Sequence, residues 1–333
     1  MDVVLAELGR RAAEKWVSLL TLPGLLFIAA AAAGRVLGHT GWADVGTLAD
    51  AGRRAAADLA REGTLTVVMA AALLLLLATA AGLAATAAGR AVRLFWLAEG
   101  RIPPGPSLIA RRSHRWEAAQ QAYADHSETV ARRIWEAGVG SGGRAGPGDS
   151  GDPAPPVDPA RQTDSGRPYD PAGDAAELDR LADRRNRICL AEPTRPLWIG
   201  DRLAATDARV YAAYGLDLGT AWPRLWLTVP EETRAEVRLA ATAFDAAAGL
   251  AGWGLLYLLL GAVWWPAAVA GAVVCAVGWR RGRVCVSVYA DLVESVVDLH
   301  GRPLAQALGL TEDPGPMTEE LGTEITAVVR KGA

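Results

Sequence analysis

The sequence predicts an all-α protein: an integral membrane four-helix bundle that carries a helical cytoplasmic module. Hydrophobic residues make up 51% of the chain and aromatic residues only 6%. Ala, Leu and Val therefore dominate the apolar composition, and such a composition favours helices over sheets. The apolar residues also gather in a few uncharged blocks, which are long enough to cross about 30 Å of hydrocarbon as helices.

The first two predicted spans are residues 16–37 and 64–89, which form an N-terminal membrane hairpin. A buried helix of a soluble protein rarely has more than about 14 uncharged residues in a row, so a soluble core is the poorer explanation. A cleaved signal peptide is the alternative for the first segment, because basic residues precede an apolar run that ends in alanines. That run is longer than the usual apolar region of about 7–15 residues, so we expect the segment to be retained.

A second hairpin is predicted from the uncharged block 246–279, which is too long for one ordinary span. Pro266 divides this block, since proline cannot continue the preceding hydrogen-bond ladder of a helix. The expected spans are 239–262 and 266–279, and the second of them is short.

Arginine placement predicts a multi-pass protein of the cell membrane with both termini in the cytoplasm. Three basic flanks lie before the first span, after the second and after the fourth, whereas the other two connections carry no net positive charge. Cytoplasmic flanks are the ones enriched in Lys and Arg. Tryptophans near the predicted boundaries are expected to be interface anchors, because an indole ring has an apolar body and a polar edge. The anchors are Trp16, Trp96 and Trp279 at the inner boundary and Trp264 and Trp265 at the outer one.

Small residues at intervals of four indicate how the spans pack, because they let helices approach closely within lipid. The candidate packing residues are Ala78, Gly82 and Thr86 on the second span and Ala267, Gly271 and Cys275 on the fourth.

One ionisable pair is a candidate functional site. Asp245 lies near the point where the third span enters the membrane, seven residues after Arg238 and on a similar helical face. An ionisable residue within a span is a functional-site hypothesis by default. Because the depth is shallow, a structural ion pair with Arg238 or a position among lipid head groups is the alternative.

The rest of the chain predicts a helical cytoplasmic part. In residues 101–137, apolar side chains recur every seven positions, and this seam fits packing against another cytoplasmic helix or self-association. A helix over 201–214 is expected to end at Gly215. The complete division is a membrane hairpin in 1–100, a cytoplasmic helix in 101–137, a disordered linker in 138–173, a helical segment in 174–227, a membrane hairpin in 228–280, cytoplasmic helices in 281–310 and a polar tail in 311–333.

The segment from Tyr289 through Asp298-Leu-His-Gly to Leu310 resembles a region after the last span of uncharacterised bacterial multi-spanning membrane proteins. The resemblance covers 22 of the 333 residues. It implies a position after the last span, and it implies no activity.

No catalytic, cofactor-binding or metal-binding pattern is found. The chain has no P-loop, nucleophile elbow or zinc-binding spacing. Its four histidines are far apart, and its three cysteines show neither the spacing of a disulfide framework nor that of a metal site. A net charge of −3 does not indicate nucleic acid as a partner.

Two function classes remain. The first is a non-enzymatic membrane protein that acts as an anchor, scaffold or signalling component, with the lipid bilayer and a cytoplasmic protein as partners. The second is an oligomeric channel or pore, in which homo-oligomers assemble through the small-residue faces.

Overall fold

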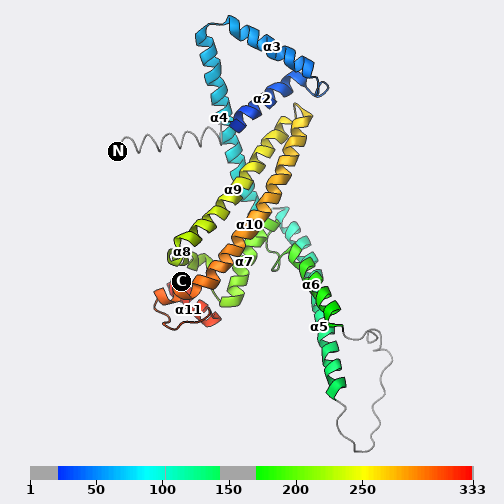
Figure 1. Ribbon diagram of the computed structural model, residues 1–333, viewed down its shortest axis with the longest axis vertical. Helices are drawn as coiled ribbons and strands as arrows, with labels where there is room; N and C mark the ends of the chain where they lie inside the picture. Colours follow the sequence, from blue (N-terminus) through cyan, green and yellow to red (C-terminus); the bar gives the residue numbers. More distant parts are fainter. Residues whose placement is uncertain (1–21, 102, 143–169, 332–333) are drawn as a thin grey trace, which may run out of the picture. The chain divides into compact units, whose positions relative to one another are not determined.

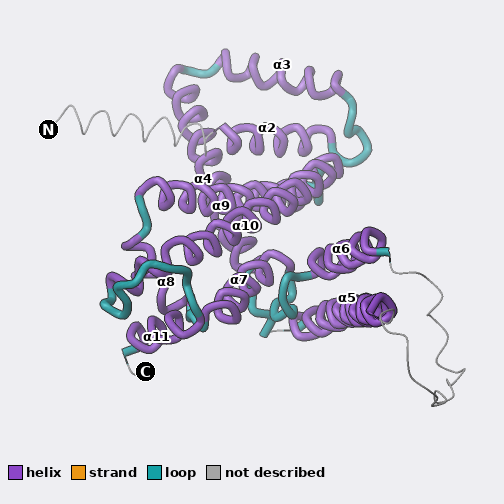
Figure 2. Tube along the Cα trace, turned by 60° about the horizontal axis from the view of Figure 1, so that its bottom comes forward, coloured by secondary structure: helices purple, strands orange, loops and turns teal. Residues whose placement is uncertain are grey.

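The computed structural model describes residues 22–101, 103–142 and 170–331. These residues form ten helices and no strand, so the prediction of an all-α chain is confirmed, and Figure 2 shows helices and loops alone. The chain divides into two compact units. The first unit contains residues 1–98 and 210–333, and the second contains residues 99–209.

Three helices make up the N-terminal part of the first unit: α2 (Leu22–Leu37), α3 (Val45–Arg61) and α4 (Thr64–Trp96). Helix α4 has 33 residues and is about 50 Å long at 1.5 Å per residue. Its first half is exposed on all sides, and its second half buries a stripe of small residues that includes Ala81, Ala85 and Gly89.

Two long helices follow in the same unit and lie side by side over much of their length (Figure 1). These are α9 (Glu231–Leu260) and α10 (Trp265–Ala307). A short turn joins them, in which the N–H of Trp264 donates to the Leu260 carbonyl at 3.1 Å. Pro266 occupies the first turn of α10, where its missing N–H leaves no helical hydrogen bond unmade.

Two of the described helices, α4 and α9, are long and apolar enough to cross a membrane. They indicate association with a membrane, but they are two of the four predicted spans. Helix α2 is apolar and has only 16 residues, and the start of its predicted span lies outside the described residues. Helix α10 is apolar only from Trp265 to Trp279, which is about 22 Å at 1.5 Å per residue.

Helix α10 runs as one helix across residue 280, where the predicted membrane hairpin gives way to the predicted cytoplasmic helices. It continues without a break for 43 residues, through Arg280, Arg281, Gly301 and Pro303. Gly301 is buried beneath the Met317 side chain, and a β-carbon there would lie 3.2 Å from the Met317 sulfur. Glycine therefore serves close packing at this position instead of ending the helix.

The C-terminal end of α10 belongs to a module with α8 (Leu218–Thr228) and α11 (Glu319–Arg330). Leu225, Val297, Leu304 and Ile325 are buried together in its apolar core. Helix α11 corrects the expectation of a polar tail over 311–333. Thr318 caps α11 by accepting from the N–H of Leu321, and the apolar face of the helix faces the core.

Polar contacts fix α11 to the start of α8. The Thr326 hydroxyl accepts from the N–H of Asp217 at 3.0 Å, and Arg330 donates to the Asp217 carboxylate at 2.6 Å. The hydrogen bond from Arg330 lowers the pKa of Asp217 below its ordinary value. Gly215, which ends α7 (Trp198–Tyr214) as predicted, has a φ of +60°, a conformation that glycine adopts without strain.

The second unit pairs α5 (Gly105–Gly142) with α6 (Pro171–Ile188), which run side by side in both views (Figures 1 and 2). The Arg133 guanidinium lies 3.0 Å from the Asp174 carboxylate, and Arg185 packs over the ring of Tyr123. The seven-residue seam of α5 thus meets another helix of the same chain. The predicted linker over 138–173 is corrected at both ends, because α5 continues to Gly142 and α6 begins at Pro171, and residues 143–169 lie outside the described part.

A buried carboxylate, that of Asp201, joins three segments of the same unit. Asp201 is 1% exposed and accepts from Arg112 at 2.7 Å and from the N–H groups of Thr194 and Arg195 at 2.8 and 2.7 Å. Burial raises the pKa of Asp201, and these donors act against that increase. These contacts hold α5 and the start of α7 to the loop between α6 and α7.

Replacing Ile325 by alanine tests the packing of α11. Ile325 is fully buried, and removing a buried isoleucine side chain to alanine costs about 2–5 kcal/mol. We expect Ile325→Ala to lower the unfolding temperature of the protein in mild detergent and to expose α11 to limited proteolysis. Val328→Ala is the control, because Val328 lies on the same helix and is 47% exposed. Equal behaviour of the two variants would contradict the packing of α11.

Candidate functional site at the junction of α4, α9 and α10

Glycines bring the backbones of α4 and α9 into contact. A β-carbon on Gly252 would lie 2.5 Å from both the Ala85 carbonyl oxygen and the Gly89 nitrogen. A β-carbon on Gly89 would lie 2.9 Å from the Cα of Gly249. Any larger side chain at these positions would force the helices apart, so glycine determines how closely α4 and α9 approach.

The contact between α9 and α10 has the same character. A β-carbon on Gly254 would lie 2.5 Å from the Cys275 sulfur, and one on Gly271 would lie 2.6 Å from the Leu258 nitrogen. Near the other end of the contact, a β-carbon on Gly278 would lie 2.9 Å from the β-carbon of Ala251. The junction therefore consists of three helices joined along glycine-rich stripes, an arrangement that suits a lipid surrounding, where apolar burial gives no net drive for helix association.

Aromatic rings close one end of the junction. Trp96 at the end of α4 is 5% exposed. Its ring lies edge-on to Trp279 of α10 at 5.6 Å between centroids and tilted against Phe244 of α9 at 6.0 Å. Aromatic pairs in such geometry contribute about 0.5–1.5 kcal/mol beyond the area that they bury.

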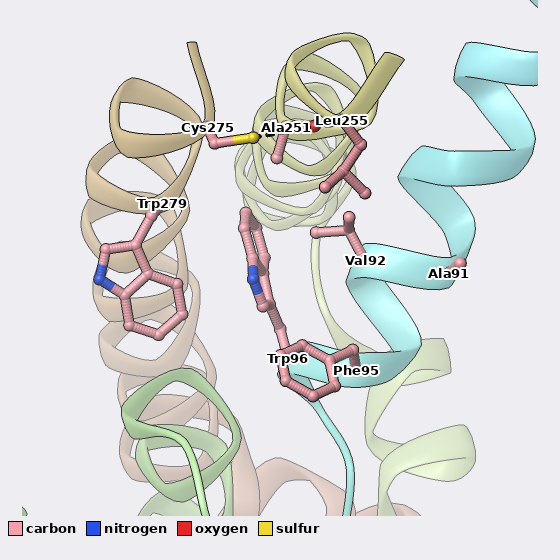
Figure 3. A pocket seen from close by; sticks show the side chains of 8 residues that line it. All are labelled: Ala91, Val92, Phe95, Trp96, Ala251, Leu255, Cys275 and Trp279. Atoms are coloured by element: carbon pink, nitrogen blue, oxygen red, sulfur yellow. Dashed lines mark hydrogen bonds between the residues drawn. The ribbon is translucent and has the colours of Figure 1, made fainter. Parts of the chain in front are cut away.

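An apolar cavity of about 460 Å³ lies beside this aromatic cluster. Figure 3 shows Val92 of α4 and Leu255 of α9 extending toward each other on one side and Trp279 of α10 on the other. The Cys275 thiol approaches the Ala251 carbonyl at 3.6 Å and is thereby engaged in packing. The lining is almost entirely apolar, so the cavity suits an acyl chain or another apolar group.

A crevice with four polar side chains among its lining residues lies between α4 and α9 on a different flank of α4. It is lined by Thr86, Arg90, Arg93 and Asp245. Arg93 donates to the Asp245 carboxylate at 2.7 Å, and both side chains are about half exposed. Asp245 is thus paired across two helices.

This arrangement corrects the predicted pair. Arg238 forms an ion pair with Glu231, seven residues earlier on α9. Asp245 is instead paired with Arg93 of α4. Sequence spacing identifies neighbours on one helix only, whereas the partner of Asp245 is 152 positions away. The pair therefore joins two helices at the end of their close contact.

Aromatic residues also mark the opposite end of the same helices. Trp265 lies edge-on to Trp42 at 5.0 Å, and His39 is hydrogen bonded to the Ala262 carbonyl at 3.0 Å. Gly34 of α2 lies against the Trp264 side chain, with a β-carbon position 2.8 Å from the Trp264 β-carbon.

The predicted anchors thus occur in two groups, with Trp96 and Trp279 in one and Trp264 and Trp265 in the other, while Trp16 lies outside the described residues. Among the predicted packing residues, Ala78 and Gly82 lie on the buried face of α4, and Thr86 is exposed. Ala267 and Gly271 are buried on α10, and Cys275 is partly buried.

Several residues that contribute to the junction are not among the predicted packing residues. The stripe on α4 is extended by Ala81, Ala85 and Gly89, and Gly254 and Gly278 add close approaches between α9 and α10. Ala81, Ala85 and Gly89 are themselves four residues apart and lie three residues beyond the predicted row, so the same spacing could have identified this second row of the face.

The described residues contain no group of three or more His, Cys, Asp or Glu side chains that could hold a metal ion. At this junction, then, the arrangement supports helix association, an apolar cavity and one ion pair. Comparisons with protein families, characterised proteins and solved structures find no match to the chain.

The pair Gly252 and Gly249 tests the close contact of α4 with α9. A β-carbon at Gly252 collides with α4, whereas one at Gly249 meets no atom within 4 Å. We expect Gly252→Ala to lower the unfolding temperature in detergent, because overpacking costs about 1–3 kcal/mol. Gly249→Ala should leave it unchanged or raise it, since alanine is favoured over glycine in a helix by up to about 1 kcal/mol. Equal effects of the two substitutions would contradict this helix contact.

Proposed function

We propose that the protein is a multi-pass, non-enzymatic membrane anchor whose cytoplasmic helices hold a protein partner. In this proposal α2, α4, α9 and the first part of α10 cross the cell membrane, with both termini in the cytoplasm. The proposal also takes residues 289–310 to follow the last span, as their resemblance to a region of uncharacterised bacterial membrane proteins implies.

The grouping of charges supports the orientation. Arg90 and Arg93 lie near the end of α4, and Arg280 and Arg281 follow Trp279 on α10. The ring contact between Trp96 and Trp279 brings these two basic stretches to the same end of the helices. Lys and Arg collect on the cytoplasmic side of a membrane, so this end is proposed to be the inner boundary.

The exposed surface of α4 supports contact with lipid. Large apolar side chains cover the first half of the helix on all sides and are exposed by 37–73%. They are Leu65, Val67, Val68, Met69, Leu73, Leu74, Leu75, Leu76 and Leu77. A helix that is apolar all round requires an apolar surrounding, and lipid supplies one.

The continuity of α10 is the main observation in support of the anchoring role. Its first part packs on α9 through glycines, and its last part contributes Val297 and Leu304 to the core of the C-terminal module. A single helix of 43 residues, about 64 Å long, joins the two. A module attached in this way is held at a fixed distance from the membrane, as an anchor or a signalling component requires.

A pore formed by several copies is the second candidate. Thr86, Arg90, Arg93 and Asp245 line a crevice, and such a polar line would suit the wall of an aqueous path. Because α9 packs backbone against backbone on both α4 and α10, the aqueous path would form between copies of the chain and not within one copy. This candidate requires a defined oligomer.

Photo-crosslinking in living cells distinguishes the two functions. A photoreactive phenylalanine analogue is placed at Leu299 in the C-terminal module, which is 70% exposed, and as a control at Leu83 on α4, which is 51% exposed. The anchor proposal predicts a discrete adduct with another protein from Leu299 and none from Leu83. Adducts only between copies, together with a defined oligomer of four or more in detergent by light scattering, would reject the anchor in favour of the pore, and no adduct from Leu299 would count against the partner.

A further inference from the structure

Helix α3 is amphipathic and has no buried residue along its 17 positions. At about 100° per residue, one face carries only apolar or small residues and the other carries all the charges. The apolar face consists of Val45, Leu48, Gly52, Ala55, Ala56 and Leu59. Val45 is 74% exposed and Leu59 is 41% exposed, so this face is uncovered within the described part of the chain.

The charged side chains on the polar face of α3 form ion pairs and hydrogen bonds within the same helix. Arg53 and Asp50 form an ion pair, Arg54 donates to the Asp50 carbonyl at 3.3 Å, and Arg61 lies 3.7 Å from Asp58. Three arginines and two aspartates leave α3 with a charge of only +1. Attraction to acidic lipids or to an acidic protein is therefore small, and the apolar face is the part of α3 that remains without a partner.

The ends of α3 are fixed relative to the neighbouring helices. Asp44 caps its first turn by accepting from the N–H of Thr47 at 3.0 Å. Only Glu62 and Gly63 separate α3 from α4, and Figure 1 shows α3 crossing from the end of α2 to the start of α4. The exposed apolar surface of α3 thus continues directly into the exposed Leu65 of α4.

Lipid is the occupant that this surface fits. Trp42, just before α3, contacts Trp265, and both residues are more than 40% exposed, as is usual for tryptophans at a membrane–water boundary. We propose that α3 lies in the plane of the bilayer at the outer boundary, with its apolar face toward the acyl chains and its charges toward water. Such helices bind through buried apolar area, and this inference depends on the proposed membrane insertion of α4.

Adjacent alanines on opposite faces give a matched test. Ala56 lies on the apolar face and Ala57 on the polar face, and both are exposed. Each is replaced by cysteine in a full-length background in which Cys189, Cys275 and Cys285 are alanine, and is then spin-labelled in phosphatidylcholine nanodiscs. Power saturation measures the accessibility of each label to oxygen, which concentrates in lipid, and to a water-soluble nickel chelate.

We expect the Ala56→Cys label to be several-fold more accessible to oxygen than to nickel, and the Ala57→Cys label to show the reverse. Equal nickel accessibility at both positions would overturn the proposal in favour of a helix in water. Exclusion of both reagents from the Ala56→Cys label would overturn it in favour of a protein contact. A Leu75→Cys label on α4 separates the placement of α3 from the membrane insertion of α4. A label at Leu75 that is accessible to nickel would refute the insertion of α4. A label at Leu75 that is accessible to oxygen, together with a nickel-accessible label at Ala56, would refute only the placement of α3.

Discussion

The close backbone contact among α4, α9 and α10 is the constraint on which the rest of the first unit depends. Gly89 and Gly252 join α4 to α9, and Gly254 and Gly271 join α9 to α10. At these contacts the space for a β-carbon is already occupied by backbone or sulfur atoms of the neighbouring helix. The aromatic cluster around Trp96, the apolar cavity and the ion pair of Asp245 all lie where they do because the three helices approach so closely.

Helix α10 relates this junction to the C-terminal module. The same helix supplies Gly271 and Gly278 to the junction and Val297 and Leu304 to the core of the module. Because α10 is one continuous helix of 43 residues, a change in how it packs on α9 would also change its position against α8 and α11. The module in turn buries the apolar face of α10 that follows Arg280 and Arg281, a face that would be exposed without α8 and α11.

Much of the fold can be predicted from the sequence, since long uncharged blocks and helical periodicity are local signals. The all-helical class, the helix pair that meets before Pro266 and the stop at Gly215 follow from such signals. The end of α10 and the existence of α11 do not. Gly301 and Pro303 normally interrupt a helix, and the packing of Met317 on Gly301 joins segments that helical periodicity cannot relate. Helix α11 was hidden by its many charges, although Leu321, Ile325 and Val329 at a spacing of four and Thr318 as a cap were available signals.

The candidate site was predicted less completely, because its contacts join distant parts of the chain. The prediction that Asp245 has an ionic partner needed only the cost of an unpaired charge near lipid, but its partner Arg93 could not be found by helical spacing. Glycine at 89, 252, 254 and 278 is common enough in an alanine-rich chain that composition alone does not single it out. The positions become meaningful only when two helices are seen to meet there.

The most direct test of the account is the sidedness of single cysteines in intact cells. In the cysteine-free background, Ala57→Cys on α3 and Ser295→Cys on α10 are both exposed positions, and a membrane-impermeant maleimide reports which of them faces the outside. The account predicts that Ala57→Cys reacts in intact cells and that Ser295→Cys reacts only after the membrane is permeabilised. Labelling of both, or of Ser295→Cys alone, in intact cells would contradict it.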